Sequence, residues 1–209
     1  MCIICISRHG VRQPNEQEIT RMWNANPHGA GYMCVRDGMV EIHKGFMTLK
    51  EFMRNVKTEK FTSNDVVLYH FRISTQGGVN PYMTHPFPFT ADIENTRLLD
   101  VRCHLGIVHN GIIRITSNGD AEYSDTALFI ANYLPALIRT VDDVHDERVK
   151  RCIADLIGSK MAFLTDSGDV ETVGKFIEDK SGLIFSNDSY KEKQFFRTYA
   201  LSENLHHAM

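Results

Sequence analysis

The chain of 209 residues lacks any apolar run approaching the roughly 20 residues that a membrane-spanning helix needs, so we expect no membrane span. It also lacks an excess of positive charge. Lys and Arg number 23 against 26 Asp and Glu, and the net charge of -3 gives no electrostatic footprint for nucleic acid or an anionic membrane surface. The apolar run near the N-terminus is too short for a signal peptide and follows no basic region.

Cysteine is scarce and irregularly placed. Five cysteines, an odd number without regular spacing, do not indicate a disulfide framework and are typical of a reducing compartment, so we expect a cytoplasmic protein. Internal repeats, low-complexity segments and linkers are absent as well. The sequence therefore predicts one domain over 1–209, with a polar, peripheral tail from about residue 187.

What the chain does have is a series of short apolar strands and a few periodic helices. Strands are expected at 2–6, 30–35, 39–44, 65–72, 104–109, 161–165, 170–174 and 183–186. Helices are expected at 16–24, from Thr48 through Val56, from Ser124 or Asp125 through Ile138, and at 145–157. Many antiparallel strands with few helices predict an α+β fold in which two sheets pack on each other and the helices lie outside.

Cys2 is the most informative residue, because it directly follows the initiator Met1. A small side chain at position two normally permits removal of the methionine, and that would leave a cysteine with both a thiol and a free α-amine. A thiol needs a base to become a nucleophile, and an α-amine with a pKa of roughly 7.7–8.0 can serve as that base. The alternative is a buried strand cysteine that packs as a small hydrophobic residue.

Other polar segments stand where apolar strands end or helices begin, which is where side chains converge on sites. They are 71–78, which contains Arg72, Thr75 and Gly77; 109–111, which contains Asn110 and Gly111; and 124–126, which contains Asp125. His85 and Pro86 lie in the long loop between the first two of these segments.

These segments together resemble the class II glutamine amidotransferases, whose glutaminase domains are N-terminal-nucleophile (Ntn) hydrolases. The resemblance rests on Cys2 after Met1, Arg-x-x-Thr-x-Gly, His-Pro, Asn-Gly and Ser-Asp-Thr in that order, and covers roughly residues 2–175. The stretch 26–31 is similar to the family's Asn-x-Asp-Gly-x-Gly. The resemblance implies a four-layer αββα sandwich of two mainly antiparallel sheets, the Ntn-hydrolase fold.

The resemblance also implies a role for each matching residue. Cys2 would attack the side-chain amide of L-glutamine, and Asn110 and Gly111 would donate hydrogen bonds to the oxyanion. Glycine at position 111 would also permit close approach of the substrate. Arg72 would bind the α-carboxylate of glutamine and Asp125 its α-ammonium group. The remaining two residues, Thr75 and Gly77, would shape the pocket rim.

Each assignment has a structural alternative. Arg72 could form an ion pair, Asp125 could cap the helix that follows it, and His85 could be a turn residue. The sequence departs from the family at Ile3 (usually Gly), Ile73 (often aromatic), Gln76 (often His) and Ala127 (often Glu). None of these departures removes a group that the mechanism requires.

Three rival hypotheses remain. Cys2 and Cys5 could bind metal or act in redox chemistry, but an offset of three places them on opposite faces of a strand and no second cysteine pair completes a zinc site. The chain could be an N-terminal-cysteine amidohydrolase of another small amide, or a non-catalytic module that binds glutamine or a partner protein.

For the glutaminase hypothesis we expect no cofactor and no metal. Only about 35 residues follow the last matching strand, too few for a synthetase domain, so a synthetase or transferase on a separate protein is the expected acceptor of the ammonia.

Overall fold

The protein is α+β, with two antiparallel sheets. The computed structural model describes residues 1–74, 78–114 and 122–191. In spatial order the larger, seven-stranded sheet consists of β10 (Ile177–Glu178), β11 (Ile184–Phe185), β1 (Ile3–Ser7), β4 (Val67–Phe71), β2 (Ala30–Arg36), β3 (Met39–Phe46) and β6 (Asp100–Cys103). The smaller, four-stranded sheet consists of β5 (Phe87–Pro88), β7 (Leu105–Asn110), β8 (Lys160–Thr165) and β9 (Val170–Val173).

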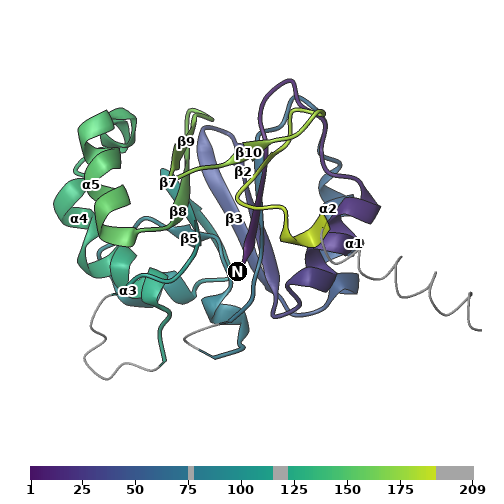
Figure 1. Cartoon of the computed structure of the whole chain (residues 1–209), viewed down its shortest axis with the longest axis horizontal. Helices are drawn as coiled ribbons and strands as arrows, with labels where there is room; N and C mark the ends of the chain where they lie inside the picture. The colour runs from purple at the N-terminus through teal and green to yellow at the C-terminus, as the bar shows by residue number, and fades with distance from the viewer. Residues whose placement is uncertain (75–77, 115–121, 192–209) are drawn as a thin grey trace, which may run out of the picture.

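Helices cover the outer faces of both sheets. The α-helices are α1 (Glu16–Ala25), α2 (Leu49–Glu59), α3 (Asp125–Asn132), α4 (Leu134–Leu137) and α5 (Glu147–Ile157). Short 3₁₀ segments lie at Pro81–Met83, Ile93–Arg97 and Val141–His145. Figure 1 shows α3, α4 and α5 beside the smaller sheet and α1 and α2 beside the larger one. The order of layers is therefore helix, sheet, sheet, helix.

The alternation of side chains along β1 explains why this strand is apolar at nearly every position. Ile4 and Ile6 point toward the smaller sheet and pack in the core between the sheets. Ile3 and Cys5 point the other way and pack against α1 and α2. Because successive side chains of a strand face opposite sides, a strand covered on both faces has no position open to water. A third core lies between the smaller sheet and α3–α5.

Local sequence signals account for several of the element boundaries. Asn15 and Glu18 form a reciprocal capping box at the start of α1, and Thr48 caps α2. Asp37 and Gly38 both have positive φ, as the two-residue turn between β2 and β3 requires. Each of these signals is readable from two to four adjacent residues.

One predicted element is wrong in extent. The periodic pattern predicts a single helix through Ile138, but α3 ends at Asn132 and the separate α4 begins at Leu134. Pro135 explains the break, because it has no N–H to donate and its ring clashes with the carbonyl group four residues earlier.

Among the described residues, no helix combines the length and the apolar character needed to cross a membrane. Of the expected polar tail, residues 192–209 lie outside the described part of the chain. Asn187 and Tyr190 are buried, and the Tyr190 ring packs against Phe185 of β11.

Candidate active site

Four of the residues singled out from the sequence line one small cavity: Cys2, Arg72, Gly111 and Asp125. They come from four segments far apart in the chain, namely the residue before β1, the end of β4, the turn after β7 and the first residue of α3. Figure 1 places the N-terminus near the middle of the molecule rather than at its margin. The cavity has a volume of about 20 Å³, room for roughly one water molecule.

The Cys2 thiol lies against the backbone of Ile73. Its Sγ accepts a hydrogen bond from the Ile73 N–H at 3.4 Å and lies 3.5 Å from the Ile73 carbonyl oxygen, to which the thiol can donate. Burial raises the pKa of the thiol, although the Ile73 N–H, the N-terminal amine and Arg72 act in the opposite direction. The thiol is therefore protonated near neutral pH and needs a base to become a nucleophile.

Arg72 and Asp125 bring opposite charges to the same cavity. Arg72 is only 3% exposed, and its Nη1 donates to the Gly78 carbonyl oxygen at 2.7 Å. Asp125 is 6% exposed; its Oδ2 accepts from the Ile113 N–H at 2.6 Å and its Oδ1 from the Thr126 N–H at 2.8 Å. Burial raises the pKa of Asp125, and these backbone donors and Arg72 oppose the rise.

The helix-capping alternative for Asp125 is wrong. The N-cap of α3 is Ser124, whose Oγ accepts from the Ala127 N–H at 3.2 Å, and Asp125 is the first helical residue. Its carboxylate instead fixes the backbone of Ile113, just after the Asn110-Gly111 turn. Asp125 therefore connects the start of α3 to the turn that follows β7.

Gly111 lines the cavity, whereas the side chain of Asn110 turns elsewhere. A Cβ atom at Gly111 would lie 2.3 Å from the Ser159 Cβ, so Ser159 excludes a side chain at this position. Asn110 is not among the lining residues: its Nδ2 donates to the Ser186 Oγ at 2.8 Å. Its Oδ1 is buried and has no hydrogen-bond partner among the described residues.

Two histidines to which sequence reasoning assigned no role at the site also line the cavity, His85 and His109. His109 lies 2.9 Å from the Thr126 hydroxyl through Nδ1 and 2.7 Å from the Ser159 hydroxyl through Nε2. The His85 ring stacks on that of His70 at 4.2 Å between centroids, and neither of its nitrogens has a partner among the described residues. The position of His109 in an apolar strand, directly before Asn110-Gly111, could have indicated its place at the site. His85 lies in a bend before β5, as the turn interpretation expects, and is buried at the cavity.

The three buried histidines predict a loss of stability in mild acid. Burial lowers the pKa of His70 and of His109 to about 3 and that of His85 well below its usual value. The unfolded chain binds protons at these positions near pH 6.5 and the folded protein does not, so the free energy of unfolding falls as the pH drops from about 6.5. We expect about 1.4 kcal/mol per pH unit for each such histidine, measured by urea unfolding at pH 7.5 and 5.0.

A single variant isolates this effect. His109→Gln should reduce the pH slope by about one proton relative to the unmodified protein. Equal slopes in the unmodified protein and His109→Gln would contradict the assignment of the acid sensitivity to the buried histidines.

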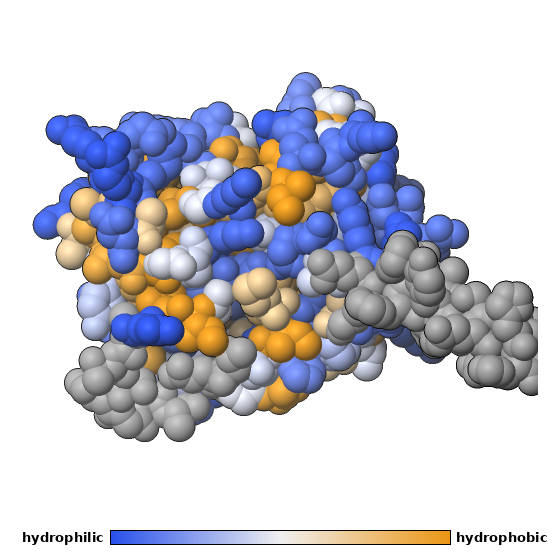
Figure 2. Space-filling view, in the orientation of Figure 1, coloured by the Kyte–Doolittle hydropathy of each residue, from blue (hydrophilic) through white to orange (hydrophobic). Residues whose placement is uncertain are grey.

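Two other predicted site residues, Thr75 and Gly77, lie outside the described residues. Two chain neighbours of cavity residues are apolar and exposed: Met1 precedes Cys2, and Ile112 follows Gly111. Figure 2 shows apolar side chains interspersed among hydrophilic ones on the face of the molecule that Figure 1 presents to the viewer.

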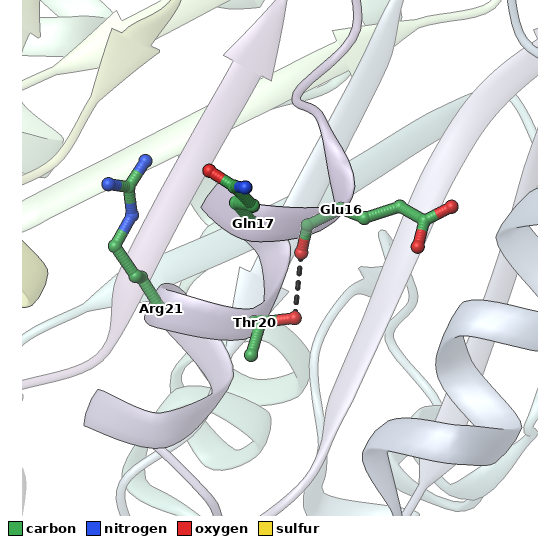
Figure 3. A pocket seen from close by; sticks show the side chains of 4 residues that line it. All are labelled: Glu16, Gln17, Thr20 and Arg21. Atoms are coloured by element: carbon green, nitrogen blue, oxygen red, sulfur yellow. Dashed lines mark hydrogen bonds between the residues drawn. The ribbon is translucent and has the colours of Figure 1, made fainter.

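A larger hollow of about 410 Å³ lies elsewhere, on α1. It is open and lined by Glu16, Gln17, Thr20 and Arg21, and the Thr20 hydroxyl donates to the Glu16 carbonyl oxygen within the helix (Figure 3). Because the Thr20 hydroxyl group donates its hydrogen bond to the backbone of α1, this hollow offers no activated nucleophile.

The described residues contain no group of three or more His, Cys, Asp or Glu side chains that could hold a metal ion. Cys5 is fully buried in the core beside α1 and α2, whereas Cys2 lines the cavity, so the two sulfur atoms lie in different environments. This separation opposes the hypothesis of a shared metal or redox pair.

No protein-family model matches the chain, and no curated protein matches it either.

Proposed function

We propose that this chain is an N-terminal-nucleophile amidohydrolase of the class II glutamine amidotransferase type, which hydrolyses the side-chain amide of L-glutamine. One observation carries the proposal: Cys2, Arg72 and Asp125 line the same small cavity. A guanidinium matches an α-carboxylate, and a carboxylate matches an α-ammonium group. The order of layers, helix, sheet, sheet, helix, supports assignment to the Ntn-hydrolase fold.

In the proposed reaction, removal of Met1 makes the α-amine of Cys2 the base. The amine takes the thiol proton, and Sγ attacks the amide carbon to form a tetrahedral intermediate. The amine then returns the proton to the leaving nitrogen, which departs as ammonia and leaves a thioester. Water hydrolyses the thioester, so glutamine and water give glutamate and ammonia.

The oxyanion of the tetrahedral intermediate needs preorganised donors. The Gly111 N–H and the side-chain N–H of Asn110 are the proposed donors, and loss of one such donor typically lowers the rate on the order of 100-fold. Since the cavity holds only about one water molecule, glutamine binding requires the lining to move apart. Arg72 uses one N–H of Nη1 for the Gly78 carbonyl oxygen, and a guanidinium has further N–H donors, from which the proposed contacts to the substrate carboxylate would come.

Two alternative functions would use the same cavity. A different small amide could be hydrolysed, or the protein could bind glutamine or a partner without catalysis. The paired charges of Arg72 and Asp125 favour a free amino-acid head over a peptide-bound glutamine, because an amide-capped head would leave one buried charge unpaired. We also propose that a synthetase or transferase on a separate protein consumes the ammonia.

Intact mass spectrometry tests the proposal most directly. The purified protein is measured before and after treatment with 6-diazo-5-oxo-norleucine, a glutamine mimic that alkylates nucleophilic cysteines. We expect loss of Met1 and a single adduct that peptide mapping assigns to Cys2, and excess glutamine should protect against labelling. If the adduct forms on the exposed Cys152 and not on Cys2, the labelling reflects accessibility and contradicts a glutamine-specific site at Cys2.

Substituting Arg72 should chiefly weaken glutamine binding. Arg72→Ala removes a charge-assisted hydrogen bond worth about 1.5–3 kcal/mol, so we expect KM to rise roughly 10- to 100-fold with a smaller change in kcat. Steady-state ammonia release measures both constants. Arg72→Lys keeps the charge without the planar fork and should give an intermediate KM; Arg148→Ala, at an exposed position, is the control. An unchanged KM in Arg72→Ala would refute the assigned role.

A further inference from the structure

We propose that Ser186 and Asn187, which directly follow β11, are the positioning residues of this site: Ser186 orients the oxyanion donor Asn110, and Asn187 fixes the main chain of the nucleophile Cys2. The inference deepens the proposed function and rests on it for the roles of Cys2 and Asn110. Neither residue lines the cavity, so both would act through the residues that they hold.

Ser186 joins two separate parts of the site through one oxygen atom. Its Oγ accepts a hydrogen bond from the Ile4 N–H at 2.9 Å and another from the Asn110 Nδ2 at 2.8 Å. Ser186 is fully buried, and its own N–H donates to the Ile4 carbonyl oxygen at 3.0 Å. The hydroxyl group therefore links β1, the strand that directly follows Cys2, to β7, the strand that ends in Asn110.

The hydrogen-bond capacity of the serine makes this link specific. A hydroxyl oxygen has two lone pairs, and the Ile4 and Asn110 donors occupy both. The Asn110 amide has two N–H groups in one plane, so a hydrogen bond from the first to Ser186 sets the direction of the second. In the proposed reaction, that second N–H is the one assigned to the oxyanion. The backbone hydrogen bonds of Ser186 do not orient Asn110, because Asn110 bonds to the side-chain oxygen of Ser186.

Asn187 contacts the main chain of the nucleophile itself. Its Nδ2 donates to the Cys2 carbonyl oxygen at 2.7 Å. The orientation of this amide is fixed, because its Oδ1 accepts from the Ser189 N–H at 3.1 Å and from the Ser189 hydroxyl at 2.7 Å. An N–H can only donate, so the oxygen must face Ser189 and the nitrogen must face Cys2. Removal of Met1 would leave this contact intact, since it uses the carbonyl group of Cys2.

The simpler explanation is that both residues only stabilise the C-terminal strand. Lys160 supports that strand as well, since its Nζ donates to the Ser186 carbonyl oxygen. A purely structural role predicts lower stability with unchanged kcat and KM in the protein that remains folded. A positioning role predicts a lower kcat at nearly constant KM, because the oxyanion donor acts on the transition state and not on the bound substrate.

The first test compares Ser186→Ala with Ser7→Ala in the full chain. Ser7 is a matched control: it is fully buried in β1, and its hydroxyl group bonds to the carbonyl oxygens of Val11 and Arg12. We expect Ser186→Ala to lower kcat about 10- to 100-fold with KM within about twofold, and Ser7→Ala to lower stability without changing kcat. Equal kcat values in the two variants would overturn the proposal.

A second measurement does not depend on catalysis. In NMR spectra of the same variants, Ser186→Ala should shift the Asn110 side-chain NH₂ signals and accelerate amide exchange at Ile4, whereas Ser7→Ala should change neither. If the Asn110 NH₂ shifts and the exchange rate at Ile4 both remain unchanged in Ser186→Ala, the positioning role is wrong, even if the protein is an active glutaminase. If they change but the unmodified protein does not hydrolyse glutamine, the hydrogen-bond link holds and the proposed function fails.

Asn187→Asp tests the other half of the pair. Aspartate has nearly the same shape and keeps both bonds to Ser189, but it presents an acceptor to the Cys2 carbonyl oxygen where asparagine presents a donor. We expect at least a 10-fold loss of kcat and slower labelling of Cys2. Unchanged kcat and labelling in folded Asn187→Asp would remove Asn187 from the proposal.

Discussion

Replacing Cys2 with alanine is expected to reduce glutamine hydrolysis by at least about 1,000-fold and to leave the fold unchanged. The thiol is the only proposed nucleophile, and no thioester can form without it. Cys2 precedes β1 and belongs to none of the buried hydrophobic clusters, so its substitution removes little packing. Ammonia release under saturating glutamine and thermal unfolding would measure the two effects separately.

Cys5→Ala is the matched control for this substitution. Cys5 lies three residues further along the same segment, fully buried against α1 and α2. Removing its sulfur creates a small cavity in the core and should lower the stability while keeping the turnover of the folded protein. Residual activity in Cys2→Ala above a few percent of the unmodified protein would show that another group attacks the amide.

Much of the fold follows from short-range sequence patterns. Continuous apolar runs predict β1, β4, β7 and β8, because each of these strands is covered on both faces. The strands β5 and β10, of two residues each, and the four-residue strand β6 were not predicted. Two residues are too few to carry a periodic pattern, and such strands exist through pairing with distant partners.

In the candidate site, too, local sequence predicts some features and distant contacts determine the others. Cys2, Arg72, Gly111 and Asp125 could be proposed together because each stands at the end of a strand or the start of a helix, and the structure brings all four to one cavity. The direction of the Asn110 side chain could not be predicted.

The orientation of the Asn110 side chain depends on Ser186, which lies 76 positions later in the chain. Ser186 in turn bonds to Ile4, 182 positions earlier. A Ser-Asn pair after a strand is an ordinary turn sequence, so only the three-dimensional contacts reveal its connection to the site.

Retention of Met1 is expected to lower glutamine hydrolysis by at least about 100-fold, because it would take away the proposed base. With Met1 in place, the nitrogen of Cys2 belongs to a peptide bond, which donates a hydrogen bond but does not accept a proton. The α-amine is then on Met1, one residue further from the sulfur. Burial raises the pKa of the Cys2 thiol, so little thiolate forms unless a base assists.

A cleavable fusion can supply both forms of the protein, one beginning at Met1 and the other at Cys2, with intact mass confirming each start. The Met1 side chain is 77% exposed, so its removal disturbs no core and the two forms should unfold at similar temperatures. For the form that begins at Cys2, kcat/KM should fall as the pH drops below roughly 7.7, the usual pKa of an α-amine. If the two forms hydrolyse glutamine equally well, the base is not the α-amine, and His85, buried in the same cavity, becomes the group to test.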